Sequence, residues 1–291
     1  MSHSTLCVVL HYGSAADTWN CVRTLVGIDA LDVLIADNDP TQSLDAASEF
    51  LGKVEVFRTG GSAGFAQANN MAVRHGRKRD HDSVLLLNND TLLGDGALTE
   101  LLAVLGRSDV GAAGPCMPMT RDPSTIWAAG GVIDRLRIVI YGRQPPSDGL
   151  PCDVDYLPGA AILCKLEVWD LAEGLPEKYF LAFEEAEYAL RVKDLGYRIM
   201  IAPKAIVLHS GGMSSDRRPM YVYNLVRSRI RFGQYLWGRV LGFLLAAGNT
   251  LLGMRRTRYG CRLWARAVTD EIRGRALDRA ALQEVEKRYP R

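Results

Sequence analysis

Short apolar runs alternate with longer amphipathic segments along the first 90 residues of the chain. The runs have the length of strands, and the run at 84–87 is apolar throughout, as in a strand covered on both faces. The predicted strands cover 6–10, 33–36, 54–57 and 84–87, and the predicted helices cover 15–26, 44–51 and a stretch that ends near Arg77. Strands and helices in this succession predict a parallel sheet with right-handed crossovers and helices on both faces.

The pattern is less regular after the fourth strand. The elements predicted there are an antiparallel hairpin or edge strands within 126–141, a buried strand over 157–163, a helix from Glu184 to Gly196, and short strands at 198–202 and 205–208. From Pro219 onward the pattern is helical. We therefore expect an α/β body over residues 1–215, with a mixed sheet and helices on both faces, followed by a helical region over 216–291.

Charge separates these two parts. The net charge is only +2, but residues 216–291 carry 17 Lys and Arg against 6 Asp and Glu, about +11, which leaves the body acidic. The apolar run from Val240 to Met254 is interrupted by Asn249 and Thr250, and it is shorter than the roughly 20 residues that span a bilayer. Arginine and tryptophan around such a run favour peripheral contact with an anionic membrane. A helical region that packs on the body with a solvated basic face is the alternative.

Cysteine spacing and the first residues of the chain predict the redox state of the thiols and the cell compartment. The six cysteines stand singly, without the spacing of a metal site, which indicates reduced and mostly buried thiols. The first residues show no basic segment followed by a long apolar stretch, so we expect no signal peptide. We predict a cytoplasmic protein, at the inner face of the cell membrane if the basic region binds lipid. The arginines accompany no recognised nucleic-acid reader motif, so we expect no nucleic-acid partner.

Polar side chains follow two of the predicted strands. Asn88, Asn89 and Asp90 follow the strand at 84–87, and Asp37 and Asn38 follow the strand at 33–36. Ligands of open α/β sheets bind at the carboxyl ends of the strands, and a carboxylate there can hold a divalent cation that bridges two phosphates. Both stretches also suit ordinary turns and helix caps.

A second stretch combines aromatic and acidic residues. An aromatic cluster at 179–183 leads directly into Glu184, Glu185 and Glu187 at the start of a predicted helix. The helix macrodipole and a Glu187–Arg191 pair explain these acids structurally. A carboxylate beside aromatic rings and another carboxylate is also expected to have a raised pKa, which suits a general base.

Two further sites leave alternatives open. His209 ends a predicted strand just before two glycines, which suits a metal or phosphate ligand, although by itself a satisfied surface or core histidine is the commoner case. The small residues Gly159 and Ala160 leave room for a ligand or for close packing.

In their order and spacing these stretches resemble the GT-A glycosyltransferases of family 2, in particular the rhamnosyltransferase-like branch. The resemblance covers about residues 5–232. The motifs that carry it are Ile35-Ala36-Asp37-Asn38, Gly64-Phe65-Ala66-Gln67-Ala68-Asn69-Asn70, Leu86-Leu87-Asn88-Asn89-Asp90-Thr91, Pro158-Gly159-Ala160-Ala161, Phe183-Glu184-Glu185, Gly196-Tyr197 and His209.

The resemblance implies an inverting transferase that uses a nucleoside diphosphate sugar, dTDP- or UDP-linked. It implies a nucleotide-sugar half over about 1–115 and an acceptor half over about 116–215. Glu185, one methylene longer than the family's usual aspartate, is implied as the base beside Glu184, and Asp90 and His209 as ligands of Mg²⁺ or Mn²⁺. The implied donor-binding residues are His11, Asp37, Asn38, Gly64, Phe65, Asn70, Asn88, Asn89 and Asp90, and the implied acceptor-binding residues are Gly159, Ala160, Phe183 and Glu187.

The implied reaction moves rhamnose or another hexose to a hydroxyl of a glycan or polyprenyl-linked acceptor, in cell-surface polysaccharide synthesis. Two alternatives remain at this stage. A sugar-nucleotide nucleotidyltransferase would share the sheet, but no glycine-rich triphosphate loop follows the first strand. An inactive scaffold module would not need Asp90, Glu185 and His209 together. The sequence also leaves open a homo-oligomer.

Overall fold

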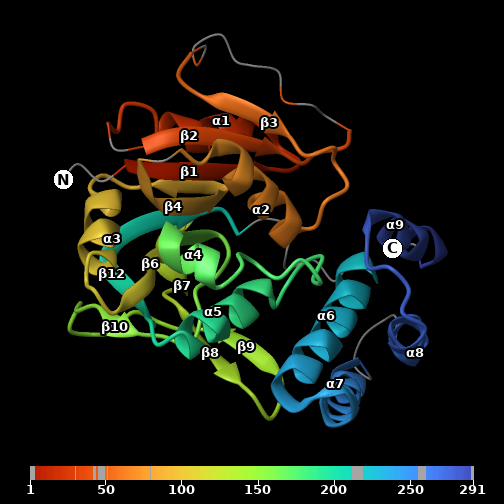
Figure 1. Ribbon diagram of the computed structural model, residues 1–291. Helices are drawn as coiled ribbons and strands as arrows, with labels where there is room; N and C mark the ends of the chain where they lie inside the picture. Colours follow the sequence, from red (N-terminus) through yellow and green to blue (C-terminus); the bar gives the residue numbers. More distant parts are fainter. Residues whose placement is uncertain are drawn as a thin grey trace.

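The computed structural model describes residues 4–29, 31–41, 44, 50, 52–78, 80–211, 219–254 and 260–289. The helix predicted over 44–51 lies mostly outside these residues. The remainder forms one large mixed sheet, with helices on both faces and a helical bundle at one side (Figure 1). The sequence prediction of an α/β fold is thereby confirmed.

The first half of the sheet is parallel, as its buried apolar strands predict. Its strands are β1 (Ser4–His11), β2 (Leu31–Asp37), β3 (Glu55–Arg58) and β4 (His81–Asn88). β1 lies between β2 and β4 and pairs in parallel with both, and β2 pairs in parallel with β3. The register places His11 opposite Asp37 and Leu10 opposite Asn88, so the polar ends of these strands meet at one edge.

The second half of the sheet is mixed. Its strands are β5 (Thr91–Leu93), β6 (Val110–Met119), β7 (Asp122–Ala128), β10 (Cys152–Asp153), β11 (Ala161–Lys165) and β12 (Arg198–His209), and a separate hairpin joins β8 (Gly131–Asp134) to β9 (Val139–Gly142). β11 pairs antiparallel with both β4 and β6. The prediction of two short strands at 198–202 and 205–208 is wrong. They form the single strand β12, whose pairing with β6 shifts between Ala202 and Ile206, at Pro203.

Two hydrophobic cores lie on opposite faces of the sheet. The helices of the body are α1 (Ala15–Arg23), α2 (Phe65–Gly76), α3 (Ala97–Leu105), α4 (Leu166–Leu171) and α5 (Glu184–Asp194). Buried residues of α1 and α3, such as Val22 and Leu101, belong to one core. Buried residues of α2, α4 and α5, such as Trp169 and Tyr188, belong to the other, on the face turned toward the viewer in Figure 1.

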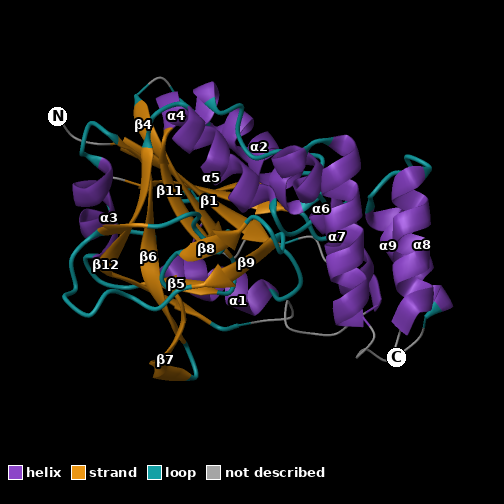
Figure 2. Ribbon diagram, turned by 90° about the horizontal axis from the view of Figure 1, so that it is seen from below, coloured by secondary structure: helices purple, strands orange, loops and turns teal. Residues whose placement is uncertain are grey.

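The C-terminal region is helical, as predicted, and its first helix packs on the body. The region contains α6 (Pro219–Trp237), α7 (Arg239–Met254), α8 (Gly260–Ile272) and α9 (Arg279–Arg288). Figures 1 and 2 both show α6 beside the body, with α8 and α9 farther out. The fully buried Arg227 of α6 donates to Glu271 of α8 over 2.7 Å, which ties the helices together. None of the described helices is both long enough and apolar enough to cross a membrane.

Candidate active site

The donor-side residues gather at the carboxyl ends of β1, β2 and β4. His11 is buried, and its Nδ1 lies 2.6 Å from Thr18 Oγ1 of α1. Within the described part of the chain, His11 Nε2 is buried without a hydrogen-bond partner. Burying an unpaired polar atom is costly, so this nitrogen is a candidate contact for a ligand.

Asp37 and Asn38 hold the loops around this edge. The two carboxylate oxygens of Asp37 accept from the backbone N–H of Leu44 at 3.1 Å and of Asp39 at 3.3 Å. The Asn38 amide donates to the Ala63 carbonyl, and its oxygen accepts from the Thr59 hydroxyl. Both residues thus hold the loops at this edge of the sheet, and direct contact with a nucleoside stays a prediction.

Gly64 and Phe65 join the donor side to the turn that precedes α5. The Phe65 N–H donates to the Phe180 carbonyl at 2.8 Å. A Cβ at Gly64 would lie only 2.7 Å from that same oxygen, so the close approach of the two segments requires glycine. The glycine predicted to approach a ligand therefore also packs against protein.

Asn70 is held by the loop that follows α4. Its amide donates to the Leu175 carbonyl and to Glu177, and its oxygen accepts from the Leu175 N–H at 3.0 Å. Because the side-chain amide is engaged on both sides, Asn70 braces the loop after α4. These contacts are structural, and the donor contact that the resemblance implies stays a prediction.

The Asn88-Asn89-Asp90 segment separates into a scaffold residue and candidate ligands. Asn88 borders the cavity described below, and its backbone N–H donates to the Ala160 carbonyl. The buried Asn89 amide donates to the Tyr12 and Ser14 carbonyls and to the Thr18 hydroxyl, which fixes the loop between β1 and α1.

Asp90 and His209 lie together because of strand pairing. β5 runs antiparallel to β12 with Thr91 opposite His209, and this register brings Asp90 Oδ1 to 3.4 Å from His209 Nε2. The Trp127 ring packs on the imidazole with centroids 4.3 Å apart. The sequence places these residues far apart, and the fold makes them neighbours.

A carboxylate oxygen and an imidazole nitrogen at this separation fit a shared divalent cation of the Mn²⁺ type. Among the described residues no group of three or more His, Cys, Asp or Glu side chains is arranged to hold a metal. A cation at this pair would therefore take its remaining ligands from water and from phosphate oxygens, which is how Mg²⁺ and similar ions bind with nucleotides.

A cavity of ≈ 320 Å³ lies beside this pair. Its walls carry Glu184, Glu185 and His209, together with the small residues Gly159 and Ala160. The aromatic side chains in its wall are Phe65, Trp127, Tyr156 and Tyr221. Of the predicted acceptor residues, only the two small ones border the cavity.

The other two predicted acceptor residues lie behind the wall. Phe183 is buried and stacks on Phe232 of α6 at 5.1 Å. Glu187 is buried too, and its oxygens are engaged by Tyr179, by Lys178 at 2.7 Å and by Arg191 at 2.7 Å. The structure thus gives Glu187 the ion-pair role that its spacing from Arg191 also predicts.

Glu184, which is buried, and Glu185, which is partly buried, form a carboxyl pair at the start of α5. Oε2 of each is buried without a hydrogen-bond partner among the described residues. Burial raises the pKa of Glu185 to about 7. Burial, followed by the charge of Glu185, raises the pKa of Glu184 well above its usual range. Two carboxyls in such a place favour one neutral and one ionisable group near neutral pH.

Backbone geometry keeps this pair in place. Ala182 and Phe183, which precede the pair, have φ of 70° and 75°, a left-handed conformation that residues other than glycine rarely adopt. Outliers of this kind occur where the surrounding structure fixes them, often at functional sites.

Sequence reasoning missed several residues that border the cavity, and four of them have large side chains. Trp127 and Ile140 come from β7 and β9, Tyr156 from the loop before β11, and Tyr221 from α6. None follows a glycine or carboxylate motif, so no local signal separates them from ordinary core residues. Only Tyr221 had a signal of any kind, as an aromatic residue at the start of an arginine-rich helix.

The chain is similar to known glycosyltransferases. The sequence profile described as glycosyltransferase like family 2 matches residues 20–231. The N-acetylglucosaminyl-diphospho-decaprenol L-rhamnosyltransferase of Mycobacterium tuberculosis is 26% identical over 215 residues, covering 65% of this chain and 69% of the relative. The dTDP-rhamnosyl transferase RfbF of Shigella flexneri is 19% identical over 220 residues, covering 74% of this chain and 72% of the relative.

Solved structures share the fold at low sequence identity. A mannosyltransferase of Pyrobaculum calidifontis, in complex with GDP-Man and Mn²⁺, matches with a TM-score of 0.56 and 15% identity, covering 94% of this chain and 76% of that one. Residues 1–349 of S. aureus TarS, in complex with UDP-GlcNAc, match with a TM-score of 0.56 and 15% identity, covering 93% and 81%. Profile, relatives and fold agree: the chain belongs to glycosyltransferase family 2 and is a glycosyltransferase of the GT-A type.

Proposed function

We propose that the protein transfers rhamnose or another hexose from a dTDP- or UDP-linked donor to a hydroxyl of a lipid-linked glycan, with inversion at the anomeric carbon. The observation that carries the proposal is one cavity whose wall holds both the Glu184–Glu185 pair and His209, next to Asp90. Support for the donor and the acceptor comes from the names of the two rhamnosyltransferase relatives.

The donor would lie at the carboxyl edge of β1, β2 and β4. Asp90 and His209 would hold a divalent cation, Mg²⁺ or Mn²⁺, which neutralises charge on the departing diphosphate when it is bound. Asp37 and Asn38 would keep the crevice open for the nucleoside. His11, with its unpaired Nε2, would face the same edge.

The acceptor would enter the cavity from its aromatic side. Glu185 would accept the proton of the acceptor hydroxyl while the oxygen bonds to the anomeric carbon and the bond to the diphosphate breaks. A base is most effective when its pKa lies near the working pH, and the pKa of Glu185 is about 7. Glu184, held neutral by its raised pKa, would leave Glu185 as the ionised member of the pair.

A donor screen tests the proposal. The full chain is incubated with UDP-, dTDP- and GDP-sugars and Mn²⁺, with and without a short polyprenyl-diphosphate-linked acceptor. We expect one dTDP- or UDP-sugar to be consumed and its sugar to appear on the acceptor with the opposite anomeric configuration. Retention of configuration would contradict the single displacement. Consumption of no donor with any lipid-linked acceptor would contradict the function.

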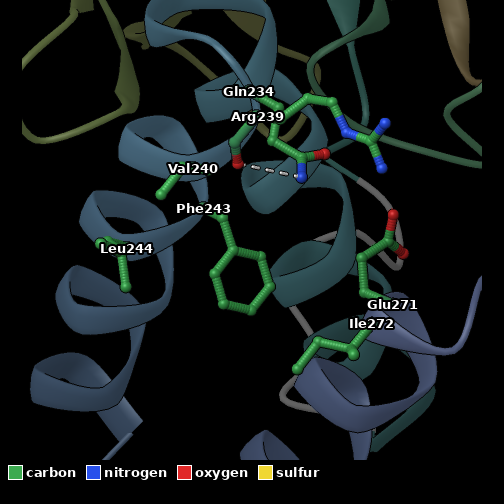
Figure 3. Close-up of a pocket in the computed structure, with 7 residues that line it drawn as sticks. All are labelled: Gln234, Arg239, Val240, Phe243, Leu244, Glu271 and Ile272. Atoms are coloured by element: carbon green, nitrogen blue, oxygen red, sulfur yellow. Dashed lines mark hydrogen bonds between the residues drawn. The ribbon is translucent and has the colours of Figure 1, made fainter.

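We further propose that α7 contacts a membrane, which suits a lipid-linked acceptor. The helix turns small residues, among them Ala246 and Ala247, toward the protein, and it leaves Val240, Leu241 and Leu244 exposed at 74%, 52% and 62%. Figure 3 shows Val240, Phe243 and Leu244 of α7 at a groove whose other side carries Ile272 of α8. Large aliphatic residues outside and small ones inside are typical of helices that meet lipid.

Vesicle flotation measures this contact. We expect the full chain to float with anionic vesicles, less so in high salt, and to bind neutral vesicles more weakly, because the region's positive charge adds a screened attraction. Replacing Val240, Leu241 and Leu244 by serine should reduce flotation severalfold. Leu171→Ser, at a leucine of α4 that is 59% exposed, is the matched control. Equal flotation of the triple variant and the control would show that α7 does not insert.

A further inference from the structure

The turn at 180–183 connects three parts of the protein. Its Phe180 carbonyl accepts from Phe65 at the start of α2. Its next carbonyl, that of Leu181, points toward α6. The left-handed pair Ala182 and Phe183 follows, and the next residue is Glu184. The path of this turn therefore determines where the carboxyl pair begins.

Two buried polar side chains of α6 converge on the single carbonyl of Leu181. Asn224 Nδ2 donates to it at 2.5 Å, and Ser228 Oγ donates to it at 3.0 Å. Both residues are almost completely buried. They are four residues apart, so they lie on one face of the helix, and Phe232, four residues further, stacks on Phe183. Three residues on one face of α6 thus contact the turn, at Leu181 and at Phe183.

Burying the polar side chains of Asn224 and Ser228 costs free energy that their hydrogen bonds must offset. Packing alone would be served by apolar residues such as Phe232. The two donors instead fix the peptide group between Leu181 and Ala182. This peptide directly precedes Ala182 and Phe183, whose left-handed backbone conformation is unfavourable. The Phe180 carbonyl accepts from Phe65 of α2, so hydrogen bonds from two different helices, α2 and α6, hold the turn.

We propose that Asn224 and Ser228 are positioning residues of the transfer reaction. By holding the Leu181 carbonyl they keep the left-handed turn in the conformation that presents Glu184 and Glu185 to the cavity. The inference rests on the proposed function of that carboxyl pair. Neither residue borders the cavity itself, so both act through the turn.

Loss of both hydrogen bonds is expected to impair the chemical step and to spare the donor. A small displacement of a reacting group costs on the order of 10–100-fold in rate. For Asn224→Ala/Ser228→Ala we therefore expect kcat to fall by about that factor, with the donor KM changed less than about threefold. A turn that relaxes also admits water to Glu185, so the acidic limb of the pH profile should move to lower pH.

The experiment compares the double variant, Ser228→Ala alone, Ser228→Thr and the control Thr250→Val. Thr250 is a buried hydroxyl of α7 that donates within its own helix and does not touch the turn. Hydrogen exchange of the peptide over 180–190 is measured beside kcat, KM and the pH profile. We expect faster exchange and lower kcat in the two alanine variants, recovery in Ser228→Thr, and neither effect in Thr250→Val.

The inference is overturned if the alanine variants keep wild-type exchange at 180–190, or if their kcat and pH profile match the wild type. It is also overturned if Thr250→Val loses as much kcat, since the effect would then follow general stability. A failure of the proposed function is distinguishable from these results. It would appear as absence of transfer by the wild type, while hydrogen exchange still reports whether α6 holds the turn.

Discussion

Glu185→Gln is expected to lower kcat by about 10²–10⁴-fold, the usual range for loss of a general base. Glutamine keeps nearly the same shape but cannot accept the proton, so the fold and the affinity for nucleoside diphosphate should be unchanged. Steady-state kinetics and calorimetric titration of the nucleoside diphosphate measure the two effects separately.

Glu184→Gln is the matched control, because Glu184 has its pKa raised well above the usual range and glutamine mimics the neutral acid. It should retain most of the activity. If Glu184→Gln is inactive while Glu185→Gln transfers normally, the two roles are reversed.

Glu185 also determines how the activity depends on pH. Glu185 must be ionised to act, and its pKa is about 7, so kcat/KM of the wild type should rise as the pH increases through about 7. Stability should change in the opposite direction. Between its ordinary pKa of 4.5 and about 7, Glu185 keeps a proton in the folded state that it has lost in the unfolded state, so the free energy of unfolding falls as pH rises through this window. Glu185→Gln should flatten both profiles.

Asp90→Ala is expected to abolish the metal-dependent part of donor binding. Asp90 is the only carboxylate of its motif, and His209 alone offers a single nitrogen to a cation. Calorimetric titration of nucleoside diphosphate with and without Mn²⁺ should show strong metal dependence in the wild type and none in the variant.

The matched control is Asp95→Ala, which removes an exposed carboxylate from the loop after β5. It should behave as the wild type does. Equal, metal-independent affinity in the wild type and in Asp90→Ala would contradict the metal assignment at this pair.

The parallel half of the fold could be predicted from the sequence because strands covered on both faces consist of nearly uninterrupted apolar residues, as in β4. The mixed half gave weaker signals. β5 has only three residues, and Pro203 made one long strand look like two. Short strands and antiparallel pairings depend on partners distant in the chain, which local patterns do not reveal.

The site was predictable to the extent that its residues follow strand ends or open a helix. Asp90, Glu185 and His209 fulfil this condition. The structure places Glu185 and His209 in the wall of one cavity, with Asp90 beside His209. Asn70 and Glu187 were also predicted as site residues, yet their side chains are engaged by Leu175 and by Arg191. Trp127 and Tyr156 reach the cavity only through tertiary packing, so the chain carries no local sign of their role.

The pairing of β5 with β12 has a consequence for assembly of the protein. Thr91 and His209 face one another although more than a hundred residues separate them, so the pair Asp90–His209 exists only after the last strand has joined the sheet. A chain in which only β1 to β4 had formed would be compact yet unable to bind at this pair. A ligand that contacts both side chains can bind only the protein whose sheet is complete. By mass action such a ligand should raise the melting temperature in proportion to the logarithm of its concentration.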